Sequence, residues 1–114
     1  MKKEYRVKKN KEFQHAFQKG KSFANRQLVI YHVKKPNQTH YRVGLSVGKK
    51  IGNAVIRNQV KRYLRQAFQE LDAYIAPDCD IIVIARQPVK DLEYAMIRKS
   101  LVHLLKKERL LNYK

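Results

Sequence analysis

The residues most suited to binding chemistry are cations that recur along one predicted helix, from Asn53 as N-cap to about Ala73. At helical spacing, basic and amide side chains fall within about 140° on one flank, namely Arg57, Asn58, Lys61, Arg62 and Arg65. Apolar side chains fill the opposite flank. Solvated helix faces usually carry acid–base pairs four residues apart, whereas this helix has no acid before Glu70. The sign bias favours phosphate binding over an ordinary solvated face.

The same bias extends well beyond this helix. The 114-residue chain has 26 Lys and Arg against 9 Asp and Glu, which gives a net charge of +17. Between Glu12 and Glu70, 57 residues contain twelve bases and no carboxylate. The pair Lys49–Lys50 lies in a predicted loop before the helix. This excess predicts a polyanionic partner, with nucleic acid the first candidate and an anionic membrane surface the second.

Three aromatic residues allow two interpretations. Phe13 and Phe17 share one face of a predicted helix, and Tyr31 lies on a predicted strand. They could belong to the apolar core. They could instead form a floor on which unstacked bases lie. The residues alone leave both interpretations open.

Catalytic groups are harder to find in the sequence. No recognisable motif contains any of the four histidines (His15, His32, His40 and His103), and no Cys/His cluster has zinc spacing. Asp78 and Asp80 flank Cys79, where we expect a loop cap rather than a metal site. The single cysteine excludes an internal disulfide and favours a reducing compartment. We therefore predict no catalytic residue and no metal ligand.

The elements that must position these residues form a single predicted domain over residues 1–114. The pattern predicts helix, two strands, helix, strand and helix, over residues 11–19, 26–33, 41–47, 53–73, 78–86 and 92–110. Asn10 is the expected N-cap of the first helix, and Gly20 is its expected end. We expect the first two strands to form a hairpin around Pro36.

The strand over residues 78–86 contains a β-branched run, which predicts burial on both faces. Strand, helix and strand in the middle of the chain form a βαβ unit, so we expect an α/β fold with helices packed on a small mixed sheet. The general rule gives that crossover a right-handed sense.

No segment predicts membrane insertion or secretion. The N-terminus lacks the apolar region of a signal peptide, and the longest apolar run, residues 81–85, is too short to cross a bilayer. We expect a cytoplasmic protein with no membrane partner.

Residues 44–65 resemble the signature of the bacterial ribonuclease P protein subunit. The matching segment runs from Gly44-Leu45-Ser46-Val47-Gly48-Lys49-Lys50 through Arg57-Asn58-Gln59-Val60-Lys61-Arg62 to Arg65. The resemblance covers nearly the whole chain, because residues 5–9, 12–13, 24–31 and 84–86 also fit. Gln59 departs from the pattern, since many members have arginine there.

The resemblance implies an α+β sandwich with the order α-β-β-β-α-β-α and a left-handed crossover. It also implies a partner, a large catalytic RNA, with which the protein removes the 5′ leader of precursor tRNA. In this family the RNA carries the hydrolytic chemistry with Mg²⁺. The protein binds the single-stranded leader and lowers the magnesium requirement.

The resemblance also assigns roles to residues. Contacts with the catalytic RNA are implied for Lys49, Lys50, Asn53, Arg57, Asn58, Lys61, Arg62 and Arg65. Contacts with the leader are implied for Phe13, Phe17, Tyr31 and Arg86, in place of a core role for the two phenylalanines.

Two alternatives have different consequences. A general RNA-binding module, such as a ribosomal protein, would carry the same charge but would not sense a tRNA leader. A stand-alone ribonuclease would cleave without RNA and would depend on His15 or His32.

Overall fold

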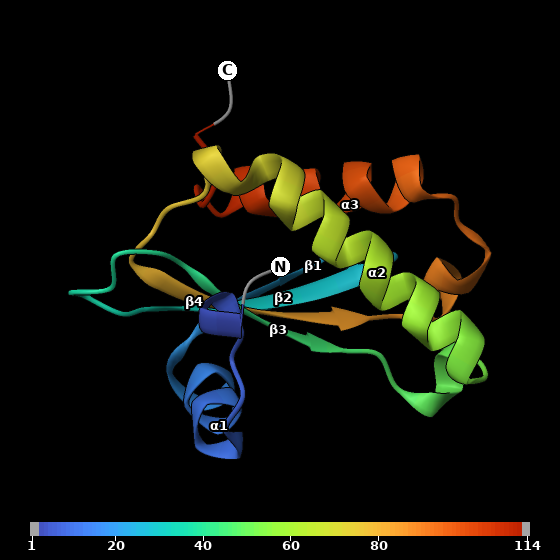
Figure 1. The fold of residues 1–114 in the computed structure, drawn as a ribbon, viewed down its shortest axis with the longest axis horizontal. Helices are drawn as coiled ribbons and strands as arrows, with labels where there is room; N and C mark the ends of the chain where they lie inside the picture. Colours follow the sequence, from blue (N-terminus) through green and yellow to red (C-terminus); the bar gives the residue numbers. More distant parts are fainter. Residues whose placement is uncertain (1–2, 113–114) are drawn as a thin grey trace.

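The computed structural model describes residues 3–112 and contains seven main elements (Figure 1). Their order is α-β-β-β-α-β-α, as the resemblance implies. They are α1 (Asn10–Lys19), β1 (Lys21–Ala24), β2 (Leu28–Lys34), β3 (Arg42–Ser46), α2 (Ala54–Leu71), β4 (Cys79–Ala85) and α3 (Tyr94–Lys107). The expected fold class, a small mixed sheet with helices packed on it, is confirmed.

The four strands form one sheet in the order β1-β2-β4-β3. The predicted hairpin between residues 26–33 and 41–47 is wrong, because β4 lies between β2 and β3. β4 is almost wholly buried, because strands flank it on both edges and helices cover both faces of the sheet. It runs parallel to β3 and antiparallel to β2. The hairpin partner of β2 is β1, a four-residue, mostly exposed strand that the residue pattern did not predict.

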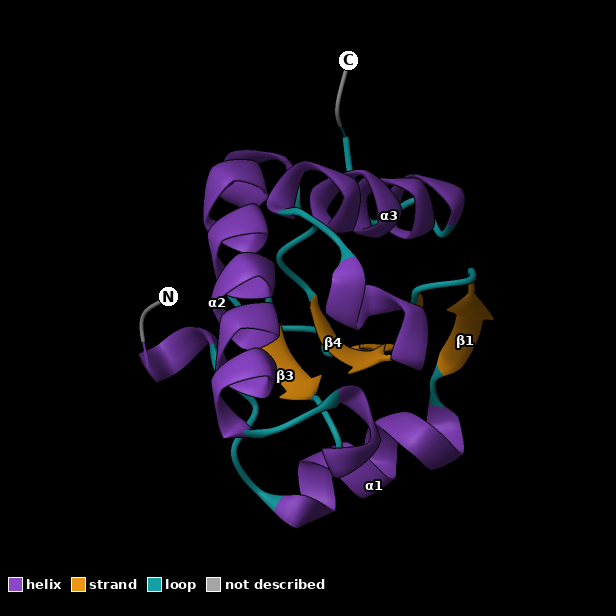
Figure 2. Ribbon diagram, turned by 90° about the vertical axis from the view of Figure 1, so that its right-hand side faces the viewer, coloured by secondary structure: helices purple, strands orange, loops and turns teal. Residues whose placement is uncertain are grey.

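The helices cover the two faces of the sheet unequally. α2 and α3 lie together over one face, whereas α1 alone crosses the other (Figures 1 and 2). Leu28 and Ile30 of β2 belong to the larger core beneath α2 and α3. Val33 and Ile82 belong to a smaller core beneath α1, together with Ala16. One helix leaves part of its face of the sheet open, with Tyr31 and Ile84 only partly buried.

The helix boundaries follow local hydrogen bonding. Asn53 caps α2 as predicted, because its Oδ1 accepts a hydrogen bond from the Ile56 N–H at 3.0 Å. Asn10 is not a cap: it is the first residue of α1, and Lys9 takes the cap position. The carboxylate of Glu12 explains this shift, since it accepts from the Lys9 N–H at 3.3 Å.

Both later helices are shorter than predicted. α2 stops at Leu71 and passes into a short 3₁₀ turn. α3 stops at Lys107, because Arg109 turns into the left-handed region with φ 57°. Within residues 3–112, no helix combines the length and the apolar character that crossing a membrane requires.

Candidate functional site

The basic face of α2 and the loop before it form one surface. Lys49 and Lys50 are exposed in a short 3₁₀ turn that the buried Ile51 anchors. On α2, Asn58 and Arg62 are exposed. Arg57, Lys61 and Arg65 are partly buried, and Lys61 and Arg65 lie beside the edge strand β3. The structure therefore brings all eight residues predicted for the catalytic RNA onto one helix and its N-terminal loop.

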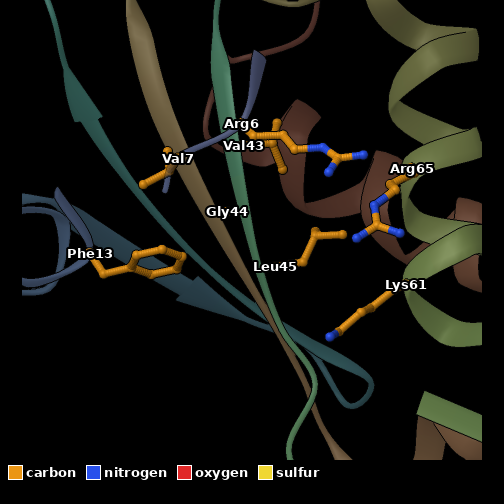
Figure 3. Close-up of a pocket in the computed structure, with 8 residues that line it drawn as sticks. All are labelled: Arg6, Val7, Phe13, Val43, Gly44, Leu45, Lys61 and Arg65. Atoms are coloured by element: carbon orange, nitrogen blue, oxygen red, sulfur yellow. The ribbon is translucent and has the colours of Figure 1, made fainter. Parts of the chain in front are cut away.

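Beside α2, the edge strand β3 borders a small cavity of about 140 Å³ (Figure 3). Three of its lining side chains are cations, Arg6, Lys61 and Arg65, and none is a carboxylate. Burial, together with repulsion from Arg6, lowers the pKa of Arg65. Such a cavity is suited to an anion. Outside its lining, one turn before Lys61 on α2, the Nε atom of Arg57 is buried and has no hydrogen-bond partner within residues 3–112.

Arg6 has no role among those predicted from the sequence. The segment before α1 brings it to the cavity by pairing with β3, where the Val7 N–H donates to the Val43 carbonyl at 2.9 Å. Four bases within residues 6–11 are the only local signal, and they do not reveal which strand this segment joins.

The aromatic side chains gather on the opposite face of the sheet. The rings of Phe17 and Tyr31 meet edge to face at 5.0 Å between centroids, and those of Phe13 and Phe17 are 6.5 Å apart. Phe17 is 39% exposed, whereas Phe13 and Tyr31 are half-buried. The cluster is therefore packed at its base and open at its top. A planar base can stack on such a floor.

Arg86 lies farther along this face. It follows β4 directly, and its guanidinium donates to the Asn25 carbonyl at 2.9 Å. Tyr31 pairs with Ile82, four residues before Arg86. That separation corresponds to about 13 Å along an extended strand. Arg86 does not join the aromatic cluster, but it lies within a few nucleotides' reach of it.

A partly buried ion-pair network, centred on the fully buried Asp80, holds α1 over the sheet. Arg42 of β3 donates to Asp80 through Nε at 2.9 Å and Nη2 at 2.6 Å, and its other terminal nitrogen pairs with Glu12 at 2.5 Å. The hydrogen bonds to Asp80 are the main reason that the pKa of Arg42 is raised.

The loop cap expected at Asp78 and Asp80 is therefore wrong. Asp80 is fully buried beneath α1, and Asp78 pairs with Lys34 on the surface at 3.5 Å. The sequence did not reveal this network because its partners lie 30 or more residues apart.

The four histidines and the single cysteine lie in different surroundings. His32 pairs with Glu108 at 2.8 Å, His40 stacks on Tyr5, and His15 and His103 are exposed. Burial raises the pKa of the Cys79 thiol to about 12, which makes it a poor nucleophile. Within residues 3–112, no three His, Cys, Asp or Glu side chains form a cluster that could hold a metal ion.

Comparison with known proteins gives a consistent result. A family model described as ribonuclease P matches residues 1–109. The ribonuclease P protein component of Oceanobacillus iheyensis is 61% identical over 97% of this chain and 92% of its own length. The ribonuclease P protein component of Geobacillus kaustophilus is 59% identical over 94% of this chain and 88% of its own length.

Solved structures agree with the sequence comparison. The RNase P protein of Staphylococcus aureus superposes with a TM-score of 0.89 at 48% identity, covering 95% of this chain and 98% of the other. The RNase P protein of Thermotoga maritima superposes with a TM-score of 0.82 at 30% identity, covering 90% of this chain and 96% of the other.

Proposed function

Because this chain belongs to the family of ribonuclease P proteins, components of a tRNA-processing endoribonuclease, we propose that it acts through RNA binding alone. In this proposal one surface holds the catalytic RNA, and a second holds the single-stranded 5′ leader of precursor tRNA. The hydrolytic chemistry belongs to the RNA. The observation that carries the proposal is the convergence of Arg6, Lys61 and Arg65 on a cavity without a carboxylate.

The catalytic-RNA surface comprises the loop and basic face of α2 together with Arg6. Arginine suits this role because its planar guanidinium can pair with two phosphate oxygens at once. A phosphate in the cavity would relieve the repulsion between Arg6 and Arg65. Asn58, exposed between the arginines, can reach a base edge or a 2′-hydroxyl.

The leader surface comprises Phe13, Phe17 and Tyr31, with Arg86 farther along the sheet. Stacking on aromatic rings tolerates any base sequence. Such tolerance suits a subunit that must accept the leaders of many precursor tRNAs. The cation at the end of the surface can contact the leader backbone without reading its bases.

Magnesium belongs mainly to the RNA in this proposal. The chain contributes positive charge between two polyanions, and this charge reduces the number of metal ions needed to hold them together. We place the protein in the cytoplasm, with RNA and not membrane as its partner.

Two substitutions test the division into two surfaces. Arg65→Ala should weaken assembly with the catalytic RNA. Phe17→Ala should weaken binding of a precursor with a leader by about 5- to 150-fold, the range for one lost stacking contact, and leave mature tRNA unaffected. Filter binding measures the affinity of the protein for the catalytic RNA and, with the assembled complex, the affinity for precursor and mature tRNA.

Tyr74→Ala is the matched control for Phe17→Ala, because Tyr74 is similarly exposed, at 45%, and lies outside both surfaces. Equal loss of affinity for precursor and mature tRNA in Phe17→Ala would contradict a leader surface at α1.

A further inference from the structure

A second, larger cavity of about 410 Å³ has no part in the proposed function. It lies where the corner between α1 and β1, the end of β2 and the turn after α3 meet. Val33, Ala76, Cys79 and Leu110 contribute apolar surface to it. A volume above about 300 Å³ with mainly apolar walls and a few polar groups is typical of small-molecule sites.

The charges around this cavity are unbalanced. Its two carboxylates already have partners, since Glu108 pairs with His32 at 2.8 Å and Asp78 pairs with Lys34 at 3.5 Å. Three further cations line the cavity, namely Lys19, Lys21 and Arg109. Within residues 3–112, none of these three forms an ion pair with a carboxylate. The cavity therefore combines an apolar interior with positive charge available to an anion.

The turn after α3 places Arg109 at the cavity. Its φ of 57° lies in the left-handed region, at the point where α3 ends. The Leu110 N–H donates to the Leu105 carbonyl at 2.9 Å, which closes the turn. Glycine adopts this conformation without steric cost and is the usual residue there. Arginine at this position keeps a guanidinium at the cavity.

We propose that this cavity binds a nucleotide, with the base against the apolar walls and the phosphate held by Lys19, Lys21 and Arg109. Inorganic phosphate alone would leave the apolar walls unused. The nucleotide is either free or one unit of a single-stranded RNA. The cavity is distinct from the leader surface, because none of Phe13, Phe17, Tyr31 and Arg86 lines it.

The test uses the ¹⁵N-labelled full chain and follows backbone amide resonances. Adenosine monophosphate, uridine monophosphate, a ten-nucleotide single-stranded RNA and inorganic phosphate are titrated separately at constant ionic strength. We expect nucleotide or RNA to shift the amide resonances of Lys21, His32 and Leu110. The affinity for inorganic phosphate at these amides should be at least tenfold weaker. A response to the mononucleotides indicates a free ligand, whereas a response to the RNA alone indicates a nucleotide within a chain.

A double substitution isolates the site. Lys21→Ala with Arg109→Gly removes two cavity charges, and the glycine suits the left-handed backbone, so the fold should persist. Arg26→Ala with Lys99→Ala removes the same charge from exposed positions outside the cavity. We expect affinity at the cavity amides to fall about tenfold or more in the first variant and about twofold or less in the control.

Three results would overturn the proposal: no shift at the cavity amides with any nucleotide or RNA, inorganic phosphate as effective as the nucleotides, or equal loss in the two variants. The readout is local to the cavity, so it is independent of precursor tRNA cleavage. The proposed function and the nucleotide site can therefore fail separately.

Discussion

At the scale of single residues, Asp80 and Arg42 determine how firmly α1 lies on the sheet. Asp80 is fully buried and accepts two hydrogen bonds from Arg42, which also pairs with Glu12 of α1. A buried carboxylate without this partner would be unstable. The network therefore links the stability of the sheet to the position of the leader surface.

Asp80→Ala should destabilise the protein by about 3 kcal/mol, because it leaves the guanidinium of Arg42 without its main partner. Asp78→Ala is the matched control, since its ion pair with Lys34 is exposed and should contribute less than about 1 kcal/mol. Urea unfolding followed by circular dichroism measures both. Equal losses in the two variants would show that the buried pair does not stabilise the fold.

Residue types and helical spacing were enough to predict the cations of α2, because one helix carries them all. The roles of Arg6 and Asp80 could not be predicted in this way. Their roles depend on the pairing of the N-terminal segment with β3 and on the contact of Arg42 with both Asp80 and Glu12. Partners so distant in sequence leave no periodic signal.

At the scale of elements, the close approach of α1 to β3 depends on Gly44. A Cβ atom on Gly44 would lie 2.7 Å from the Phe13 ring and 2.9 Å from the Ile82 side chain. The ring of Phe13 therefore rests directly on the strand (Figure 3). Phe17, one turn further along α1, then reaches Tyr31.

Gly44→Ala should displace Phe13, lower stability by about 1–3 kcal/mol and weaken binding of leader-bearing tRNA. Gly48→Ala is the matched control, because a Cβ there meets no atom within 4 Å. Thermal unfolding and precursor binding measure the two effects. Adding Phe13→Ala should recover part of the stability lost in Gly44→Ala, and strictly additive losses would argue against this contact.

The element types were largely predictable, but the sheet order was not. Alternation identified β2 and β3, and the apolar run identified β4. Adjacency in sequence then suggested a hairpin that the structure does not contain. The structure inserts β4 between those strands, and its paired residues lie 38 or more positions apart in the chain, so no local pattern reveals the order. β1 was missed because four mostly exposed residues give no hydrophobic pattern.

At the scale of the whole molecule, two surfaces of different chemistry lie on opposite faces of one small sheet and meet at its β3 edge, where Phe13 lines the cavity of Arg6, Lys61 and Arg65 (Figure 3). The basic face belongs to α2, which covers one face of the sheet, and the aromatic cluster belongs to α1 and the other (Figures 1 and 2). In the proposed function the protein contacts two RNA segments at once. The net charge of +17 should then make both contacts depend on ionic strength.

Affinity for the catalytic RNA should fall steeply with salt. Each phosphate contact contributes about 0.7–0.9 to the slope of log affinity against log salt, so about five contacts predict a loss of about 130- to 500-fold for a fourfold rise in salt. Arg6→Ala should reduce the slope by about one contact. An unchanged slope in Arg6→Ala would exclude Arg6 from the RNA surface.

The central claim is that this chain assists a catalytic RNA by holding the leader of its substrate. The most direct measurement is cleavage of precursor tRNA at low magnesium by a ribonuclease P RNA from a close relative, with and without the protein, over a series of leader lengths. The account predicts stimulation that grows as the leader lengthens to several nucleotides, and no cleavage by the protein alone. Stimulation that is independent of leader length, or absent while RNA binding is intact, would contradict it.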